Sequence, residues 1–236
     1  MIVQRRGDRQ WLITQPDHAA LARTIMANWR TNGFPESGRR ADILIAVDEH
    51  DNGWRETDAQ PIVDASGTVL DFMTAPAEVR RGVWSRGIRR LAGSPYAAAL
   101  VAQHAIHIYR RYRGEQGWDP FFAEMESARD HHLEIAGHRN QDELRRDYVF
   151  LRIADLASLS FCCGWTETQT DDSGSGHAVR LEGTRLIITP DPFGGRQVPI
   201  AVPGRELPAR VESQDAAAAA FAAAKPTMLS GIVSGQ

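Results

Sequence analysis

The chain has 236 residues, 42% of them hydrophobic and 24% charged, which is ordinary globular composition and enough for one sizeable core. A formal net charge of −3 provides no overall basic field, so a nucleic-acid polymer is not an expected partner. We find no secretion signal at the start and no apolar run near the ~20 residues of a membrane span. Cys162 and Cys163 are adjacent, which suits small core residues better than a disulfide. We therefore expect a reduced, cytoplasmic protein without a membrane partner.

The first two thirds of the chain carry mainly helical patterns. Residues 1–13 predict a β-hairpin, because two apolar runs flank the turn residues Gly7 and Asp8. Residues 52–76 predict a loop. Apolar spacing typical of helices recurs in six segments, over residues 16–29, 40–51, 77–91, 95–113, 120–136 and 141–163.

The last third changes character. After a polar loop, residues 178–211 hold short β-like runs separated by Gly and Pro, which we expect to pair with the N-terminal hairpin in a small sheet. The Ala-rich tail at 213–236 is predicted to be helical or partly disordered. The sequence thus predicts one mainly α domain over residues 1–212, with β elaboration at 178–211.

Four side chains that can bind a metal lie on the apolar faces of three predicted helices. His18 is followed by apolar residues at offsets of 3, 4, 7 and 11, and Asp155 has apolar residues four positions before and after it. His50 and Asp51 follow Val47 by three and four positions. An isolated buried carboxylate costs several kcal/mol unless it is paired or metal-bound. The pattern predicts a shared cation, and these ligand types suit Fe, Mn, Zn, Co or Ni.

A simpler interpretation stands beside this one. A histidine on an apolar face is often only a hydrogen-bonded core residue, and Arg152, three positions before Asp155, offers that acid an ordinary ion pair. His104 lies at the centre of another apolar stripe and His107 lies at its flank, one turn further along. The joint pattern of histidines and acids on four helices favours the metal site.

The order of His18, then His50 and Asp51, then Asp155 resembles the H…HD…D signature of the HD-domain superfamily. The segments PDHAALARTIMANW, AVDEHDNGW and AAALVAQHAIHIYRRY resemble, more narrowly, a bacterial HD-like family described only as a domain of unknown function. This resemblance covers roughly residues 10–165. It implies an HD-like helical bundle in which these four residues hold a divalent metal, and it implies phosphohydrolase activity, which most superfamily members have.

The resemblance and the residues together predict a metal-dependent hydrolase of HD type that acts on a phosphoester of a small molecule or nucleotide. Asp51 would orient a water molecule and His104 would transfer a proton. Trp54, next to the His-Asp pair, and His107 would contact the substrate. For Trp54, a role as a loop anchor in the core is an equally good interpretation.

Two alternatives stay open. A minority of the superfamily holds two irons and oxidises small polyols or phosphonates, using two additional histidines between the His-Asp pair and the last Asp. Residues 52–103 contain no His, and His104 and His107 share one helix, so we predict one metal with His104 as an optional further ligand. A second metal on His104 and His107, or a non-catalytic sensor or scaffold with a residual metal site, are the competing hypotheses.

Overall fold

The computed structural model describes residues 1–30, 33–36, 38–137 and 140–236. Each of the six predicted helices is present. Between the second and third of them, where a loop was expected, lie a 3₁₀ turn, η1 (Asn52–Trp54), and a short helix, α3 (Arg55–Ala59). The predicted helices are α1 (Gln15–Ala27), α2 (Gly38–Glu49), α4 (Ala77–Arg90), α5 (Pro95–Tyr109), α6 (Asp119–Ile135) and α7 (Gln141–Cys163).

Local signals explain where the helices that matter most begin. The side chain of Thr14 accepts a hydrogen bond from the backbone N–H of Asp17, and Pro16 occupies the first turn of α1, where its missing N–H costs nothing. Asn140 and Glu143 form a capping box at the start of α7. A short 3₁₀ turn, η2 (Arg110–Tyr112), follows α5.

The predicted fold class, mainly α with a small sheet, is wrong. The structure contains a seven-stranded mixed sheet in the order β1-β2-β6-β7-β5-β4-β3. The expected pairing of the N-terminal hairpin with a later strand is present, between β2 and β6. Strand β7 comes from the tail and pairs with β6 on one side and with β5 on the other, which joins the hairpin side of the sheet to β5, β4 and β3. The strands are β1 (Ile2–Arg6), β2 (Arg9–Ile13), β3 (Gln169–Thr170), β4 (Ala178–Glu182), β5 (Arg185–Thr189), β6 (Gln197–Pro208) and β7 (Thr227–Gly235).

The two longest strands, β6 and β7, continue through residues that usually interrupt strands, so the extent of the sheet was underestimated from the sequence. β6 includes Pro199 and Pro203, but β2 pairs only with residues 205–208 of β6. At both prolines β6 therefore pairs with β7 on one side and has no partner from β2 on the other, where a missing N–H is tolerated. β7 includes Gly231, where a Cβ would collide with the carbonyl oxygen of Thr184. The Ala-rich stretch before β7 forms helix α8 (Gln214–Ala223).

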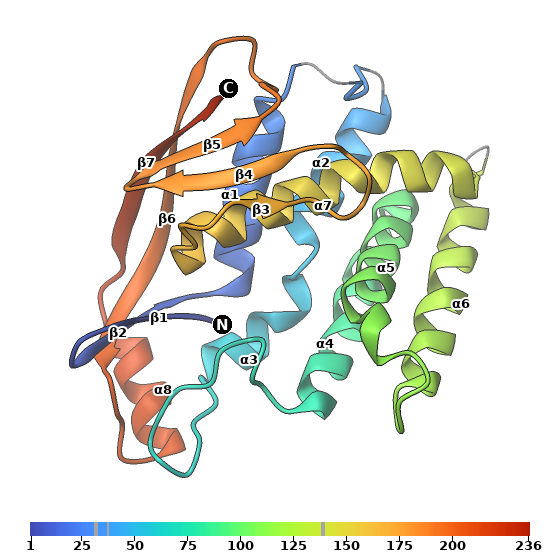
Figure 1. The fold of residues 1–236 in the computed structure, drawn as a ribbon. Helices are drawn as coiled ribbons and strands as arrows, with labels where there is room; N and C mark the ends of the chain where they lie inside the picture. Colours follow the sequence, from blue (N-terminus) through green and yellow to red (C-terminus); the bar gives the residue numbers. More distant parts are fainter. Residues whose placement is uncertain (31–32, 37, 138–139) are drawn as a thin grey trace.

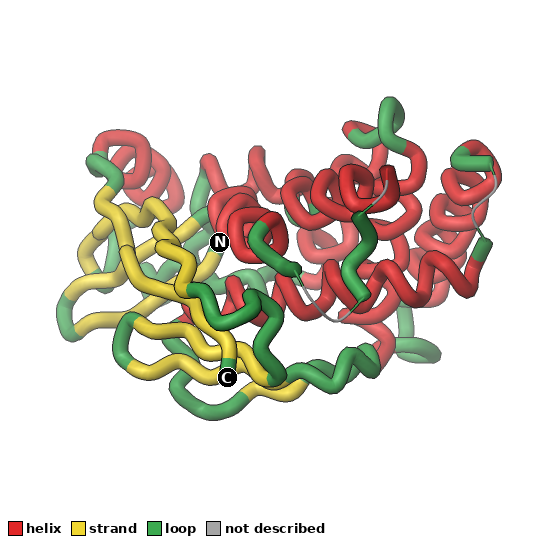
Figure 2. Tube along the Cα trace, turned by 90° about the horizontal axis from the view of Figure 1, so that it is seen from above, coloured by secondary structure: helices red, strands yellow, loops and turns green. Residues whose placement is uncertain are grey.

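The elements form two adjoining regions. Helices α1 and α7 lie against the curved sheet, where they contact β6 and β4, respectively (Figure 1). Helix α2 contacts α1, α5 and α7, while α4 and α6 pack on α5. Seen from above, the strands gather on one side of the molecule and most helices on the other (Figure 2). Among the described residues, no helix combines the length and the apolarity that crossing a bilayer requires.

Candidate metal centre

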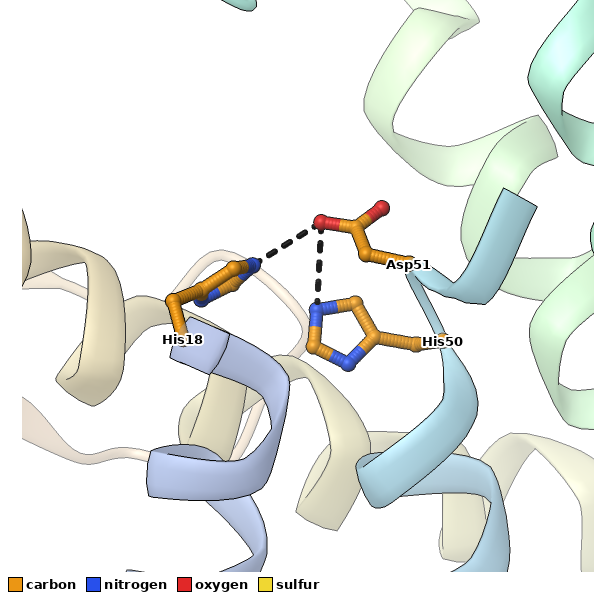
Figure 3. Close-up of side chains that lie close together, drawn as sticks. All are labelled: His18, His50 and Asp51. Atoms are coloured by element: carbon orange, nitrogen blue, oxygen red, sulfur yellow. Dashed lines mark hydrogen bonds and ion pairs between the residues drawn. The ribbon is translucent and has the colours of Figure 1, made fainter. Parts of the chain in front are cut away.

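The first turn of α1 and the end of α2 bring three of the predicted ligands together. His18 Nε2 lies 2.8 Å from Asp51 Oδ2, and His50 Nε2 lies 3.6 Å from the same oxygen. Figure 3 shows the two imidazoles and the carboxylate pointing at one another. All three side chains are buried. His18, His50 and Asp51 therefore form a first triad with metal-binding geometry.

Helices α5 and α7 add a second triad, made of His50, His104 and Asp155. Asp155 Oδ1 lies 3.5 Å from His50 Nε2, and Asp155 Oδ2 lies 3.7 Å from His104 Nε2. His50 belongs to both triads, so the two groups meet at one imidazole. Asp155 Oδ2 also accepts a 3.3 Å hydrogen bond from Arg152, so the simple ion pair considered from the sequence is present but satisfies only one of its oxygens.

Hydrogen bonds behind the triads fix which nitrogen of two histidines faces inward. The backbone carbonyl of Val47 only accepts, so His50 Nδ1–H donates to it over 2.7 Å, which leaves Nε2 to bind either a second proton or a cation. The hydroxyl of Ser158 donates to the carbonyl of Asp155 over 3.0 Å, so its oxygen accepts from His18 Nδ1–H over 2.9 Å. Outer partners of this kind orient metal-binding histidines in proteins. Both inward Nε2 atoms are thereby prepared to bind a cation.

The inward nitrogen of His50 lacks a hydrogen-bond partner, whereas that of His18 lies 2.8 Å from Asp51 Oδ2. The buried His50 Nε2 lies between the carboxylates of Asp51 and Asp155, at 3.6 and 3.5 Å. A proton or a cation must lie between such groups. Burial acts to lower the pKa of His50, but the charges of Asp51 and Asp155 outweigh it and raise this pKa to about 9. The donor set of two imidazoles and two carboxylates therefore fits a divalent transition-metal ion.

His104 differs from the other two histidines. Its Nδ1 lies 3.2 Å from the hydroxyl of Tyr148, which can donate or accept, so this partner does not fix the tautomer of the ring. Burial lowers the pKa of His104 to about 3. His104 is thus a neutral imidazole at pH 7, and its partner leaves open which of its nitrogens carries the proton.

A pocket of about 210 Å³ opens beside the triads. Asp51, Asp155 and His104 form part of its wall, so the candidate metal centre borders this space. Trp54 and His107, predicted to contact substrate, also line it. Trp54 is nevertheless buried, so it anchors the loop and borders the pocket at once. His107 belongs to neither triad and instead contacts Asp172 at 2.9 Å.

A family comparison covers all of these residues. The sequence family described as "Protein of unknown function (DUF3891)" matches residues 1–209. The chain belongs to this family. No curated protein and no solved structure matches the chain. Membership in DUF3891 carries no stated activity, so the function of this chain has to be argued from the geometry of the site.

Several residues that shape the site were not predicted from the sequence. Ser158 and Tyr148 orient the histidines from α7, but a hydroxyl on a core-facing stripe resembles an ordinary core residue. Asp172 lies in the loop before β4, and no local signal predicts where that loop packs. Asp58 is also buried, and its Oδ2 accepts a 2.6 Å hydrogen bond from the backbone N–H of Gln15 at the start of α1.

Proposed function

We propose that this chain is a metal-dependent hydrolase of HD type that cleaves a phosphoester of a small molecule or nucleotide. One observation carries the proposal: the Nε2 atoms of His18 and His50, oriented by outer hydrogen bonds, face the carboxylates of Asp51 and Asp155 at the wall of a pocket. The order of these residues along the chain is also that of the HD-domain superfamily, which supports the assignment of type.

The four residues would hold one divalent ion. A cation held there would supply Lewis-acid polarisation of a phosphoryl oxygen and would make a water molecule more acidic. Two arguments favour a single ion. His50 is common to both triads, and it offers only one nitrogen because Nδ1 is committed to Val47.

The remaining chemistry would fall to side chains of the chain itself. In hydrolysis the oxygen of water bonds to phosphorus, the bond from phosphorus to the ester oxygen breaks, and the leaving oxygen gains a proton. Asp51 borders the pocket and would orient the water by accepting a hydrogen bond from it. His104 borders the same pocket and would take a proton from the water and return it to the leaving oxygen. Tyr148 would hold the ring of His104 in either tautomer.

The test begins with the metal. The whole chain, purified without chelator or metal-affinity steps, is analysed for metal content, stripped, and reloaded separately with Fe(II), Mn, Zn, Co or Ni. We expect about one ion per chain and hydrolysis of chromogenic phosphomonoesters and phosphodiesters, or of nucleotides, only in a loaded form. Asp51→Asn should lose both metal and activity, while Asp48→Asn, which changes a partly exposed acid paired with Arg23, should lose neither. A loaded protein inactive on every substrate class would contradict the proposal.

A second candidate is an HD-type metal-dependent oxidase with two irons, and the second triad of His50, His104 and Asp155 is the observation that favours it. Anaerobic purification separates the two candidates. Two irons per chain together with substrate-dependent consumption of O₂ would support the oxidase. One ion per chain without oxygen consumption would support the hydrolase.

A further inference from the structure

Asp172 lies against two arginines and a histidine at the edge of the pocket. Its Oδ1 accepts a hydrogen bond from His107 Nε2 at 2.9 Å and another from Arg152 Nε at 3.4 Å. Its Oδ2 accepts from a guanidinium nitrogen of Arg110. One carboxylate therefore receives hydrogen bonds from three different side chains, a coordination that also suits an oxyanion of phosphate.

The three donor side chains come from the helical part of the molecule, whereas Asp172 does not. His107 comes from α5, Arg110 from η2 and Arg152 from α7, and all three line the pocket that borders the candidate metal centre. The side chains of His107 and Arg152 are about 15% exposed. Asp172 is 44% exposed and belongs to the loop between β3 and β4. His107 and Arg152 are thus held by their surroundings, whereas Arg110 is 51% exposed and Asp172 sits on a solvent-facing loop.

Arg152 connects this cluster to the candidate metal centre. Its Nη1 donates to Asp155 Oδ2 at 3.3 Å while its Nε donates to Asp172 Oδ1 at 3.4 Å. One guanidinium therefore spans the distance between a candidate metal ligand and the carboxylate of Asp172. An anion in the place of that carboxylate would lie next to the metal centre.

Asp172 contacts all three donor side chains, whereas Asp155 contacts only Arg152 among them. Among the described residues, Asp172 is the carboxylate that both His107 and Arg110 contact. Burial acts to raise the pKa of Asp172, but the hydrogen bonds from His107 and Arg110 outweigh it and lower this pKa. Without Asp172, Arg110 would keep only its hydrogen bond to the carbonyl of His107. The cluster then needs another anion.

We infer that His107, Arg110 and Arg152 form a binding site for a phosphoryl group, and that the Asp172 carboxylate occupies this site until a substrate phosphate displaces it. The inference rests on the proposed function, since it gives the phosphoester a position next to Asp155. Aromatic side chains, Trp84 and Trp165 among them, form part of the pocket wall, so the organic part of the substrate would stack there.

The size of the pocket narrows the substrate class. A volume of about 210 Å³ is below the ~300–1,000 Å³ of pockets that enclose drug-sized ligands. A small phosphomonoester with a flat or apolar organic group fits these features better than a dinucleotide or a polymer end. His107, which the sequence suggested as a substrate contact, takes this role as part of the phosphate site.

The inference is tested with inorganic phosphate as the probe, by calorimetric titration of the whole chain after chelator treatment, so that no metal contributes. Asp172→Asn removes the competing charge and should tighten phosphate binding about tenfold, whereas Arg110→Gln should weaken it about tenfold, as expected for one charge-assisted interaction. Asp142→Asn, an exposed acid paired with Arg145, is the matched control and should change nothing. Binding should weaken as salt is added.

Two outcomes would overturn the inference. One is equal phosphate affinity in the wild type and in Asp172→Asn, with circular dichroism showing both folded. The other is acetate binding as tightly as phosphate, which would make the cluster a site for carboxylates. Because the titration uses metal-free protein, it is independent of the hydrolase test. Phosphate binding with the expected variant effects, but without metal-dependent hydrolysis, would leave the phosphate site standing and remove the proposed activity.

Discussion

Asp147 and Asp155 are both buried on α7, about two helical turns apart, but they have different partners. Asp147 accepts hydrogen bonds from Nε and Nη2 of Arg39 and from the hydroxyl of Tyr96. Asp155 has a single 3.3 Å hydrogen bond from Arg152, and otherwise faces His50 and His104. One acid is neutralised by a bidentate arginine, and the other lies among imidazoles that can share a cation with it.

This difference predicts opposite effects of two matched substitutions. Asp147→Asn breaks a buried ion pair and should lower the free energy of unfolding by roughly 3 kcal/mol, with metal content unchanged in the folded fraction. Asp155→Asn should lose the metal and should cost the metal-free protein less stability than Asp147→Asn. Denaturant titration and elemental analysis of both proteins measure these quantities. If the two variants behave alike, Asp155 is an ordinary structural acid.

Replacement of His104 by Ala should separate proton transfer from metal binding. Because the four proposed ligands do not include His104, we expect the variant to retain one metal per chain. We expect it to lose ~10²-fold or more in turnover, the usual scale for a general acid–base. Turnover is measured on the best substrate found for the wild type, and metal content on the same sample. Loss of one of two bound ions would instead favour the dinuclear oxidase.

The stability of the metal-free protein should depend on pH through His50. Its folded-state pKa, about 9, lies above its ordinary value of 6.5, so the folded state binds this proton more tightly than the unfolded state. The resulting stabilisation is complete below pH 6.5 and disappears as the pH rises towards 9. Thermal unfolding of stripped protein across this range measures the effect. His50→Gln should flatten the alkaline slope, and an unchanged slope would assign it to other groups.

Gly53 should be intolerant of even one added methyl group. It lies in η1, directly after the His-Asp pair, and a Cβ there would collide with the carbonyl oxygen of Val83 on α4. Overpacking of this kind costs ~1–3 kcal/mol, so Gly53→Ala should lower the melting temperature and disturb metal retention by moving Asp51. Gly93→Ala, at a position with open space around it, is the control. Equal melting temperatures for both variants would show that α4 shifts to make room for the methyl group without loss of stability.

The helices and the convergence of His18, His50, Asp51 and Asp155 could be anticipated because helical periodicity shows which side chains share a buried face. Their role as ligands stays a prediction. The residues behind them could not be anticipated in the same way, since Ser158 gains meaning only when α1 lies against α7. Periodicity within one helix contains no information about that packing.

The extent of the sheet was mispredicted for a related reason. Pro199 and Pro203 are ordinarily signals against a strand, and only the limited pairing of β2 with β6 makes them acceptable. The segment that became β7 contains Ser and Gly and has few buried side chains, so its sequence gives little sign of a strand. Pairing with β5 and β6 on either side stabilises it, and these contacts are distant in sequence.

The place of β7 also has a consequence for how the chain assembles. In the described residues, β1, β2 and β6 form one part of the sheet, β3, β4 and β5 form the other, and β7 provides the strand-to-strand link between them. A nascent chain that has emerged only as far as residue 226 therefore has two unjoined sheet fragments with open edges, although every residue of both triads is already available. Contacts between distant segments form late and slowly, so during synthesis the helices around the triads can pack before the sheet closes.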